Sequence, residues 1–258
     1  MGKIRLMLAS LFMLLAVHAN AQGLLNRFMN WVTGVETIEA SDNIITKTVD
    51  LKAFDVLRLS GSIDVTYIQE EGTIHPRVVM TGPDNILEII VVEQNGSTLK
   101  VHYKSNTNFR LNRKPLTVEV YSSDIRKISL SGSGDLEFGD LRVGDFDLTL
   151  SGSGDVEGGN IRSTGSVAVS ISGSGDVEVK QVGCFDLTMS ISGSGDMEVG
   201  EVNSESVKAS IAGSGDIQLA GTTQKATYKV VGSGNIDARS LKAQEVSKSK
   251  AGSGSISY

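Results

Sequence analysis

Residues 151–157 read Ser151-Gly152-Ser153-Gly154-Asp155-Val156-Glu157, and this stretch decides the fold because its pattern recurs along the chain. The Gly-Ser-Gly element occurs seven times, with its first glycine at positions 132, 152, 173, 193, 213, 232 and 252. Successive copies therefore lie 19 to 21 residues apart. A nearly constant period of this length is typical of repeat proteins in which each repeat forms one structural unit.

Each repeat carries two short runs in which apolar and polar residues alternate, one on each side of the glycines. In one repeat, Phe146, Leu148 and Leu150 precede the glycines and Val156 follows them. A further isolated apolar residue comes after most turns, at Leu141, Ile161, Val182, Val202 and Leu241. Alternation with a period of two indicates a strand with one buried face. Because one repeat cannot bury that face alone, residues 125–258 are predicted to form an all-β parallel β-helix, or solenoid, with coils of about 20 residues and the right-handed sense expected of parallel crossovers.

Residues 46–124 are predicted to form a less regular, β-rich N-terminal part of the same domain. Gly61-Ser62-Ile63-Asp64 is an imperfect copy of the repeat corner, which indicates an early coil. Asn95-Gly96 lies between two apolar runs and predicts a two-residue hairpin. Residues 104–114 are polar and basic, and we expect them to form an exposed loop.

The corner and the last repeat raise specific expectations. Glycine suits a sharp corner because it adopts positive φ freely, and the following Asp is expected to accept an N–H across the bend. In the last repeat, Lys248 and Lys250 occupy positions that are apolar in earlier repeats. Since unpaired charges in an apolar stack are costly, either this strand lies at an open end or its register shifts, so that Ser249 and Ala251 face inward.

Residues 1–21 are predicted to be a secretory signal peptide. Lys3 and Arg5 precede an apolar run from residue 6 to residue 17, and Ala19-Asn20-Ala21 is a small-residue cleavage site. The alternative is a retained anchor helix. Residues 22–45 are predicted to be an amphipathic lead-in or cap, with a membrane-surface or partner contact as the alternative. We therefore expect the chain to be exported to the periplasm, the outer-membrane surface or the extracellular space. No integral membrane segment is expected after cleavage.

The net charge narrows the classes of partner, and the single cysteine excludes an internal disulfide. The chain has 24 Lys and Arg against 30 Asp and Glu, and removal of Lys3 and Arg5 leaves 22 basic residues and a net charge of −8. An acidic chain is not suited to nucleic acid or to anionic membranes. One cysteine, Cys184, cannot form an internal disulfide, and we interpret it as a small filler of the fold rather than a reactive thiol.

Two rows of acidic side chains are the candidate functional feature. Stacked coils would align Asp135, Asp155, Asp176, Asp196 and Asp216 in one row and Glu137, Glu157, Glu178 and Glu198 in a second, both pointing outward. Like charges one coil apart repel by about 1 kcal/mol even in water. Two explanations stay open. In the first, the Asp side chains bond N–H groups and nearby basic residues offset the charge; these residues are Arg142, Arg162, Lys180 and Lys208. In the second, the Asp row binds Ca²⁺.

Signals for catalysis are weak. Beyond the predicted signal peptide only His75 and His102 remain, and neither has a partner at a recognisable spacing. The Gly-Ser-Gly corner lacks the helix that a phosphate-binding loop requires. No cofactor is therefore predicted apart from the Ca²⁺ considered above, and the chain is predicted not to be an enzyme.

With these motifs the chain resembles the head GIN domain family of putative auto-transporter adhesins, which are exported Bacteroidetes-type β-helix proteins. The resemblance covers residues 46–258. It rests on Asp50-Leu51 with Phe54 and Leu57, on Gly61-Ser62-Ile63-Asp64-Val65, on Asn85 and Leu87 with Leu99 and Val101, and above all on the Ser-Gly-Ser-Gly-Asp repeats. It implies a β-helical fold and a periplasmic or surface location.

The leading functional hypothesis is a non-enzymatic binding protein that presents an acidic, Ser-rich face to an unknown glycan or protein. The alternative is a periplasmic structural or assembly module that forms homo-oligomers through its solenoid edge. A polysaccharide-active β-helix enzyme is the third hypothesis.

Overall fold

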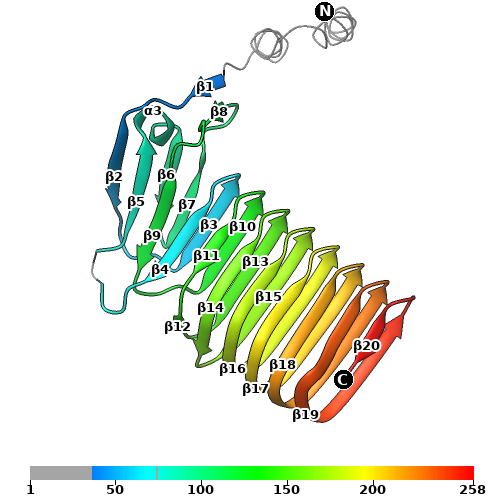
Figure 1. Ribbon diagram of the computed structural model, residues 1–258. Coiled ribbons are helices and arrows are strands. Elements are labelled where there is room, and N and C mark those ends of the chain that lie inside the picture. Colours follow the sequence, from blue (N-terminus) through cyan, green and yellow to red (C-terminus); the bar gives the residue numbers. More distant parts are fainter. Residues whose placement is uncertain (1–36, 74) are drawn as a thin grey trace, which may run out of the picture.

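The computed structural model describes residues 37–73 and 75–258, which are mostly strand, with one short helix in the described part (Figure 1). The predicted signal peptide and the predicted lead-in up to residue 36 lie outside the described residues. The helix is α3 (Asp84–Leu87). The strands are β1 (Thr37–Glu39), β2 (Ile44–Asp50), β3 (Val56–Gly61), β4 (Val65–Gln69), β5 (Arg77–Pro83), β6 (Ile90–Asn95), β7 (Thr98–Tyr103), β8 (Asn108–Arg110), β9 (Thr117–Ser122), β10 (Lys127–Gly132), β11 (Leu136–Phe138), β12 (Leu141–Val143), β13 (Phe146–Gly152), β14 (Val156–Ser163), β15 (Ser166–Gly173), β16 (Val177–Gly193), β17 (Met197–Gly213), β18 (Asp216–Gly232), β19 (Asn235–Ala251) and β20 (Ser255–Ser257).

The repeats form a parallel solenoid whose coils stack along one axis, as predicted (Figure 1). Side A contains β10, β13, β15 and the C-terminal halves of β16 to β19. Side B contains β11, the start of β14, the N-terminal parts of β16 to β19, and β20. Side C contains β12, the end of β14 and the middle parts of β16 to β19. The Gly-Ser-Gly element turns the chain from side A to side B.

The spatial order of the N-terminal strands differs from their order along the chain. The coil made of β3 and β4 lies between β10 and β11 on one side and β7 and β9 on the other. Antiparallel β6 and β5 then pair with β7 and β9, and β2 pairs with β5. These antiparallel strands close the N-terminal end of the solenoid (Figure 1), and the predicted Asn95-Gly96 hairpin joins β6 to β7.

The prediction of an exposed loop over residues 104–114 is wrong in part. Within this segment β8 pairs in parallel with β1, and Phe109 is the partner of Ile38. The Phe109 ring lies 4.6 Å from the ring of Tyr103, between centroids. Lys114 Nζ donates to the Ala40 carbonyl oxygen at 2.7 Å. A small apolar cluster under this segment holds it on the protein, which the polar composition did not reveal.

The corner glycines are required for two different reasons. Gly152 has a φ of +143°, and an added Cβ would lie 2.0 Å from the carbonyl oxygen of Gly132 in the preceding coil. Gly154 needs no positive φ, yet its Cβ would also lie 2.0 Å from the Gly134 oxygen. Positive φ was predicted from the sequence. The close approach of neighbouring coils was not, because it depends on how they stack.

Of the two alternatives for Lys248 and Lys250, the open end is confirmed, because the C-terminal half of β19 stays in register with β18 and does not turn Ser249 and Ala251 inward. Lys248 and Lys250 align with the buried Tyr228 and Val230. They lie at the open end, where Lys250 Nζ donates to the Gly254 carbonyl oxygen at 2.9 Å. Lys248 Nζ lies 4.5 Å from the centroid of the Tyr258 ring. Both ammonium groups therefore have partners although they occupy inward positions.

Candidate functional site

The five predicted aspartates form one exposed row along the corner between sides A and B. The sequence predicted that each carboxylate accepts a hydrogen bond across its own bend. In the structure each one instead accepts a hydrogen bond from the next coil. Asp135 Oδ1 accepts the main-chain N–H of Asp155 at 2.9 Å, and Asp155 Oδ1 accepts that of Asp176 at 3.0 Å. The same contact links Asp176 to Asp196 and Asp196 to Asp216, each at 2.7 Å. One carboxylate oxygen per coil thus has a structural role.

The row continues past Asp216 with an uncharged residue that makes the same contact. Asn235 N–H donates to Asp216 Oδ1 at 2.8 Å, and Asn235 Oδ1 accepts the N–H of Ser255 at 3.0 Å. Asn235 Nδ2 also donates to Asp216 Oδ1 at 2.9 Å, which a carboxylate could not do. The hydrogen-bond pattern therefore explains a polar acceptor at this position, but it does not explain the negative charge.

The four predicted glutamates form a second exposed row on side B. Glu137, Glu157, Glu178 and Glu198 are aligned residue for residue. The residues between the two rows, such as Val177, turn their side chains into the core. The strip between the Asp row and the Glu row is therefore hollow, and we call it the acidic groove.

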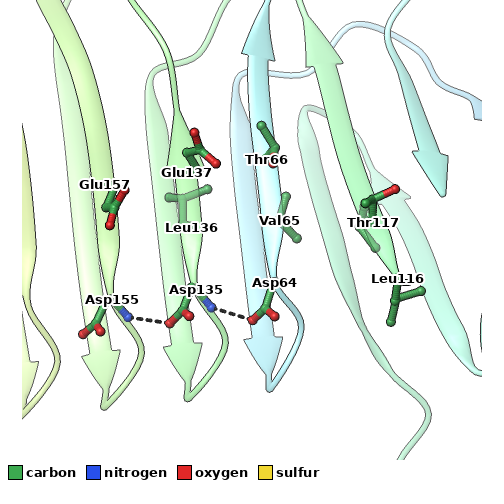
Figure 2. Close-up of a pocket in the computed structure, with 11 residues that line it drawn as sticks. Asp64, Val65, Thr66, Leu116, Thr117, Asp135, Leu136, Glu137, Asp155 and Glu157 are labelled. Carbon is green, nitrogen blue, oxygen red and sulfur yellow. Dashed lines mark hydrogen bonds between the residues drawn. The ribbon is translucent and has the colours of Figure 1, made fainter. Parts of the chain in front are cut away.

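Two hollows on consecutive coils make up the acidic groove. One of about 360 Å³ is lined by Asp135, Asp155, Glu137 and Glu157 and reaches Leu116 at its N-terminal end. Figure 2 shows these carboxylates on neighbouring strands, with the contacts from Asp155 to Asp135 and from Asp135 to Asp64. The second, of about 630 Å³, continues along the remaining carboxylates of both rows as far as β20.

Two members of these rows were not predicted from the sequence. Asp64 begins the Asp row, and its Oδ1 accepts the N–H of Asp135 at 3.0 Å. The imperfect repeat copy at residues 61–64 was the available signal. Asp237 continues the Glu row in register with Gln218. Hydrogen bonds from the Arg239 side chain and main chain lower the pKa of Asp237 to about 2.

Between residues 135 and 216 the four basic residues named above make no ion pair with either row, so that part of the prediction is wrong. Arg142 pairs with Glu71 at 3.0 Å, and Arg162 lies 3.8 Å from Asp140. Within residues 37–73 and 75–258, no ion pair joins a Lys or Arg to either row between residues 135 and 216. The carboxylates of the acidic groove are therefore free to meet a partner.

Metal binding by the Asp row stays a prediction. In the described part of the chain, no group of three or more His, Cys, Asp or Glu side chains is close enough to hold an ion. Two exposed serine rows border the Asp row. One is at the corner, with Ser153, Ser174 and Ser194, and the other on side A, with Ser151 and Ser172. The predicted acidic and Ser-rich features thus adjoin around one corner.

The Cys184 side chain is half-buried on side C, and we expect it to react slowly. Burial, with a smaller contribution from the charge of Asp186, raises the pKa of its thiol to about 11. Because the thiolate is the reactive form, a disulfide reagent near pH 8 should label the folded chain at least about tenfold more slowly than the urea-unfolded chain. Equal labelling rates would contradict a buried, unreactive thiol.

The sequence and the fold are similar to those of one protein family. The family model described as putative auto-transporter adhesin, head GIN domain, matches residues 53–181 and again residues 160–258. A search of curated proteins finds no match. Over the residues that the structure describes, no helix has the length and hydrophobicity needed to cross a bilayer.

Several solved structures share the fold. A putative lipid binding protein from Parabacteroides distasonis is 25% identical, with a TM-score of 0.74 over 86% of this chain and 99% of that chain. A putative adhesin from Bacteroides fragilis is 24% identical, with a TM-score of 0.75 over 85% of this chain and 99% of that chain. A putative adhesin from Parabacteroides merdae is 21% identical, with a TM-score of 0.65 over 86% and 98% of the two chains. The last two similarities concern the fold alone.

Proposed function

Because the chain belongs to the family of putative auto-transporter adhesins with a head GIN domain, we propose that it is an exported adhesion module that binds rather than catalyses. Its contact surface is the acidic groove. The groove runs across consecutive coils, and four of them offer the same Asp and Glu pair, from Asp135 and Glu137 to Asp196 and Glu198. Such a surface suits an extended partner that is bound at many equivalent points.

The observation that carries this proposal is a charge that the fold does not need. Asn235 makes the same inter-coil hydrogen bond through its main-chain N–H and adds a second one through its side-chain amide. It does so without placing a second negative charge next to Asp216. Aspartate nevertheless stands at the preceding positions, from Asp64 to Asp216. Each neighbouring pair of carboxylates costs about 1 kcal/mol of repulsion. A repeated cost without structural benefit indicates that the charge serves binding.

The partner is a positively charged surface or chain. Residues 127–202 contain 13 Asp and Glu against 4 Lys and Arg, so the negative charge of the protein is concentrated on the middle coils. The apolar side chains beneath the groove point into the core, which favours an ionic contact over a lipid contact. Attraction of this kind speeds association and weakens as salt is added.

Assembly through the solenoid edge is less well supported. The terminal strand of side A, which is the C-terminal half of β19, carries Lys248 and Lys250 at inward positions. Inward-pointing charges on an edge strand oppose the addition of another strand. We therefore expect the purified chain to remain monomeric when its mass is measured by light scattering at increasing concentration. A mass that doubles with concentration would favour the assembly module.

Replacing Asp155, Asp176 and Asp196 together by Asn should separate charge from structure. Each Asn keeps the acceptor of the inter-coil bond, so the melting temperature should stay equal or rise. Binding to immobilised poly-L-lysine at low salt should fall about tenfold or more, because three of the facing charges are removed. The same three positions changed to Ala should lower the melting temperature, because each loses a hydrogen bond worth about 1 kcal/mol.

The matched control removes the same number of charges elsewhere. Glu88→Gln, Glu93→Gln and Glu245→Gln lie outside both rows and change the net charge equally. Their combination should bind poly-L-lysine nearly as well as the unmodified chain. Equal losses in both triple variants would mean that net charge, and not the acidic groove, determines binding.

A further inference from the structure

A hollow separate from the acidic groove lies at the corner between sides C and A. It has a volume of about 260 Å³ and is formed by three successive coils, those of β17, β18 and β19. Its lining residues are Asn203, Ser204, Thr222, Thr223, Gln224, Lys242, Ala243 and Gln244. We call it the polar recess. No carboxylate lines it, so its chemistry differs from that of the acidic groove.

The recess lies directly after an irregularity in the repeat. The first glycines at 213 and 232 are 19 residues apart, whereas the spacings before and after are 20. The pairing of β18 with both neighbours shifts just before Gly221, where one residue is left out. Gly221 has a φ of +116°, and a Cβ there would lie 2.1 Å from the Val202 carbonyl oxygen. The middle coil thus requires glycine at this bend, which lies beside the recess.

The polar side chains of the recess divide into two groups. The hydroxyls of Ser204 and Thr223 are buried and bond to each other at 3.2 Å. In contrast, the side chains of Asn203, Gln224 and Gln244 are exposed and make no hydrogen bond within the described part of the chain. Each amide offers both donors and an acceptor. These groups are available to a ligand that also carries both donors and acceptors.

An exposed aromatic ring lies on the coil that precedes the recess. Phe185 is 53% exposed, whereas Phe138 and Phe146 are buried in the core. Phe185 lies on the same outward row as Gln224 and Gln244, two coils before Gln224, with Glu205 between. Phe185 does not line the recess itself, but it lies on the coil next to that of Asn203 and two coils, or about 10 Å, from Gln224. Nothing in the packing of the coils requires a phenyl group at this exposed position.

We propose that the polar recess and Phe185 form a binding subsite for a neutral carbohydrate. One face of a pyranose ring carries C–H groups that pack against a phenyl ring, while its hydroxyls both donate and accept, as side-chain amides do. Pockets for drug-sized ligands have volumes of about 300–1,000 Å³, so this smaller recess suits one sugar unit of a longer chain. The subsite does not depend on the acidic groove.

The test uses the purified chain and defined sugars. Neutral oligomers of glucose, mannose, galactose and N-acetylglucosamine are screened by saturation-transfer NMR and titrated by calorimetry. At least one is expected to bind, and Phe185→Ala should weaken it about tenfold or more while leaving the melting temperature unchanged. The double change Asn203→Ala and Gln224→Ala should weaken it similarly.

Two controls carry matched side chains on other surfaces. Gln218→Ala removes an exposed amide beside the acidic groove, and Val231→Ala removes an exposed apolar group on side A. Both should bind the sugar normally, as should the triple Asp→Asn variant that tests the acidic groove. No binding of any oligomer at millimolar concentration would overturn the proposal. Unchanged binding by Phe185→Ala would also overturn it. So would a combined glycan and peptide array on which the chain binds peptides and no sugar.

Discussion

Replacing Gly173 by alanine is expected to destabilise the protein by about 4 kcal/mol. Gly173 has a φ of +146°, which only glycine adopts readily, and forcing another residue there costs about 1–3 kcal/mol. In addition, the new Cβ would lie 2.0 Å from the carbonyl oxygen of Gly152. That oxygen is backbone and accepts the N–H of Ser174 at 2.9 Å, so it cannot move away freely. Overpacking of this kind adds about 1–3 kcal/mol.

Gly61 provides the matched control. It occupies the equivalent corner in the β3–β4 coil and also has a positive φ, of +90°. However, no atom lies within 4 Å of a Cβ placed there, because the neighbouring coil formed by β7 and β9 lacks this corner. Gly61→Ala should therefore cost only the backbone strain of about 1–3 kcal/mol. Urea unfolding of the two variants measures the difference.

The behaviour of the whole solenoid offers a second readout. Repeat proteins are stabilised by contacts between neighbouring repeats, so an interior defect weakens the coupling between the two sides of the stack. Gly173→Ala should broaden or split the unfolding transition, whereas Gly61→Ala should shift it while keeping its shape. If both variants unfold at the same urea concentration, stacking of the corners is not what requires glycine.

The corner shows how far the sequence predicts this fold. The period and the alternation were enough to predict parallel coils, because both follow from the local spacing of residues. The need for positive φ at Gly152 is also local. The need for glycine at Gly154 is not, since it arises from the Gly134 oxygen one coil away. The position of β3 and β4 between two pairs of later strands, β10 and β11 on one side and β7 and β9 on the other, could not be predicted either, because it depends on pairing over long distances.

The same distinction holds for the candidate sites. The Asp and Glu rows follow from the repeat and were predicted residue by residue, apart from Asp64 and Asp237. The partner of each Asp was predicted wrongly, because the bond joins two coils and a bend within one coil offered a nearer donor. The 19-residue spacing before Gly232 was visible in the sequence. Its relation to the polar recess required the register of β18 against both neighbours.

The second large effect is expected where a large and a small residue face each other in the core. Phe138 and Gly158 are aligned on adjacent coils of side B, at a position that Val179 fills in the next coil. A Cβ on Gly158 would lie 2.5 Å from the Phe138 ring. Gly158→Val should therefore cost about 3 kcal/mol through overpacking. Phe138→Val should cost about 3 kcal/mol through the cavity left behind.

Combining Phe138→Val with Gly158→Val should restore much of the lost stability, because the two valines reproduce the regular column that continues at Val179. The double variant should lie within about 2 kcal/mol of the unmodified chain, which gives a coupling of about 4 kcal/mol in a double-mutant cycle measured by urea unfolding. Gly158→Val combined with Val199→Ala, two coils away, should instead be additive. Additivity of the first pair would mean that Gly158 is required by its backbone, and that the phenyl ring of Phe138 is not what excludes a larger side chain.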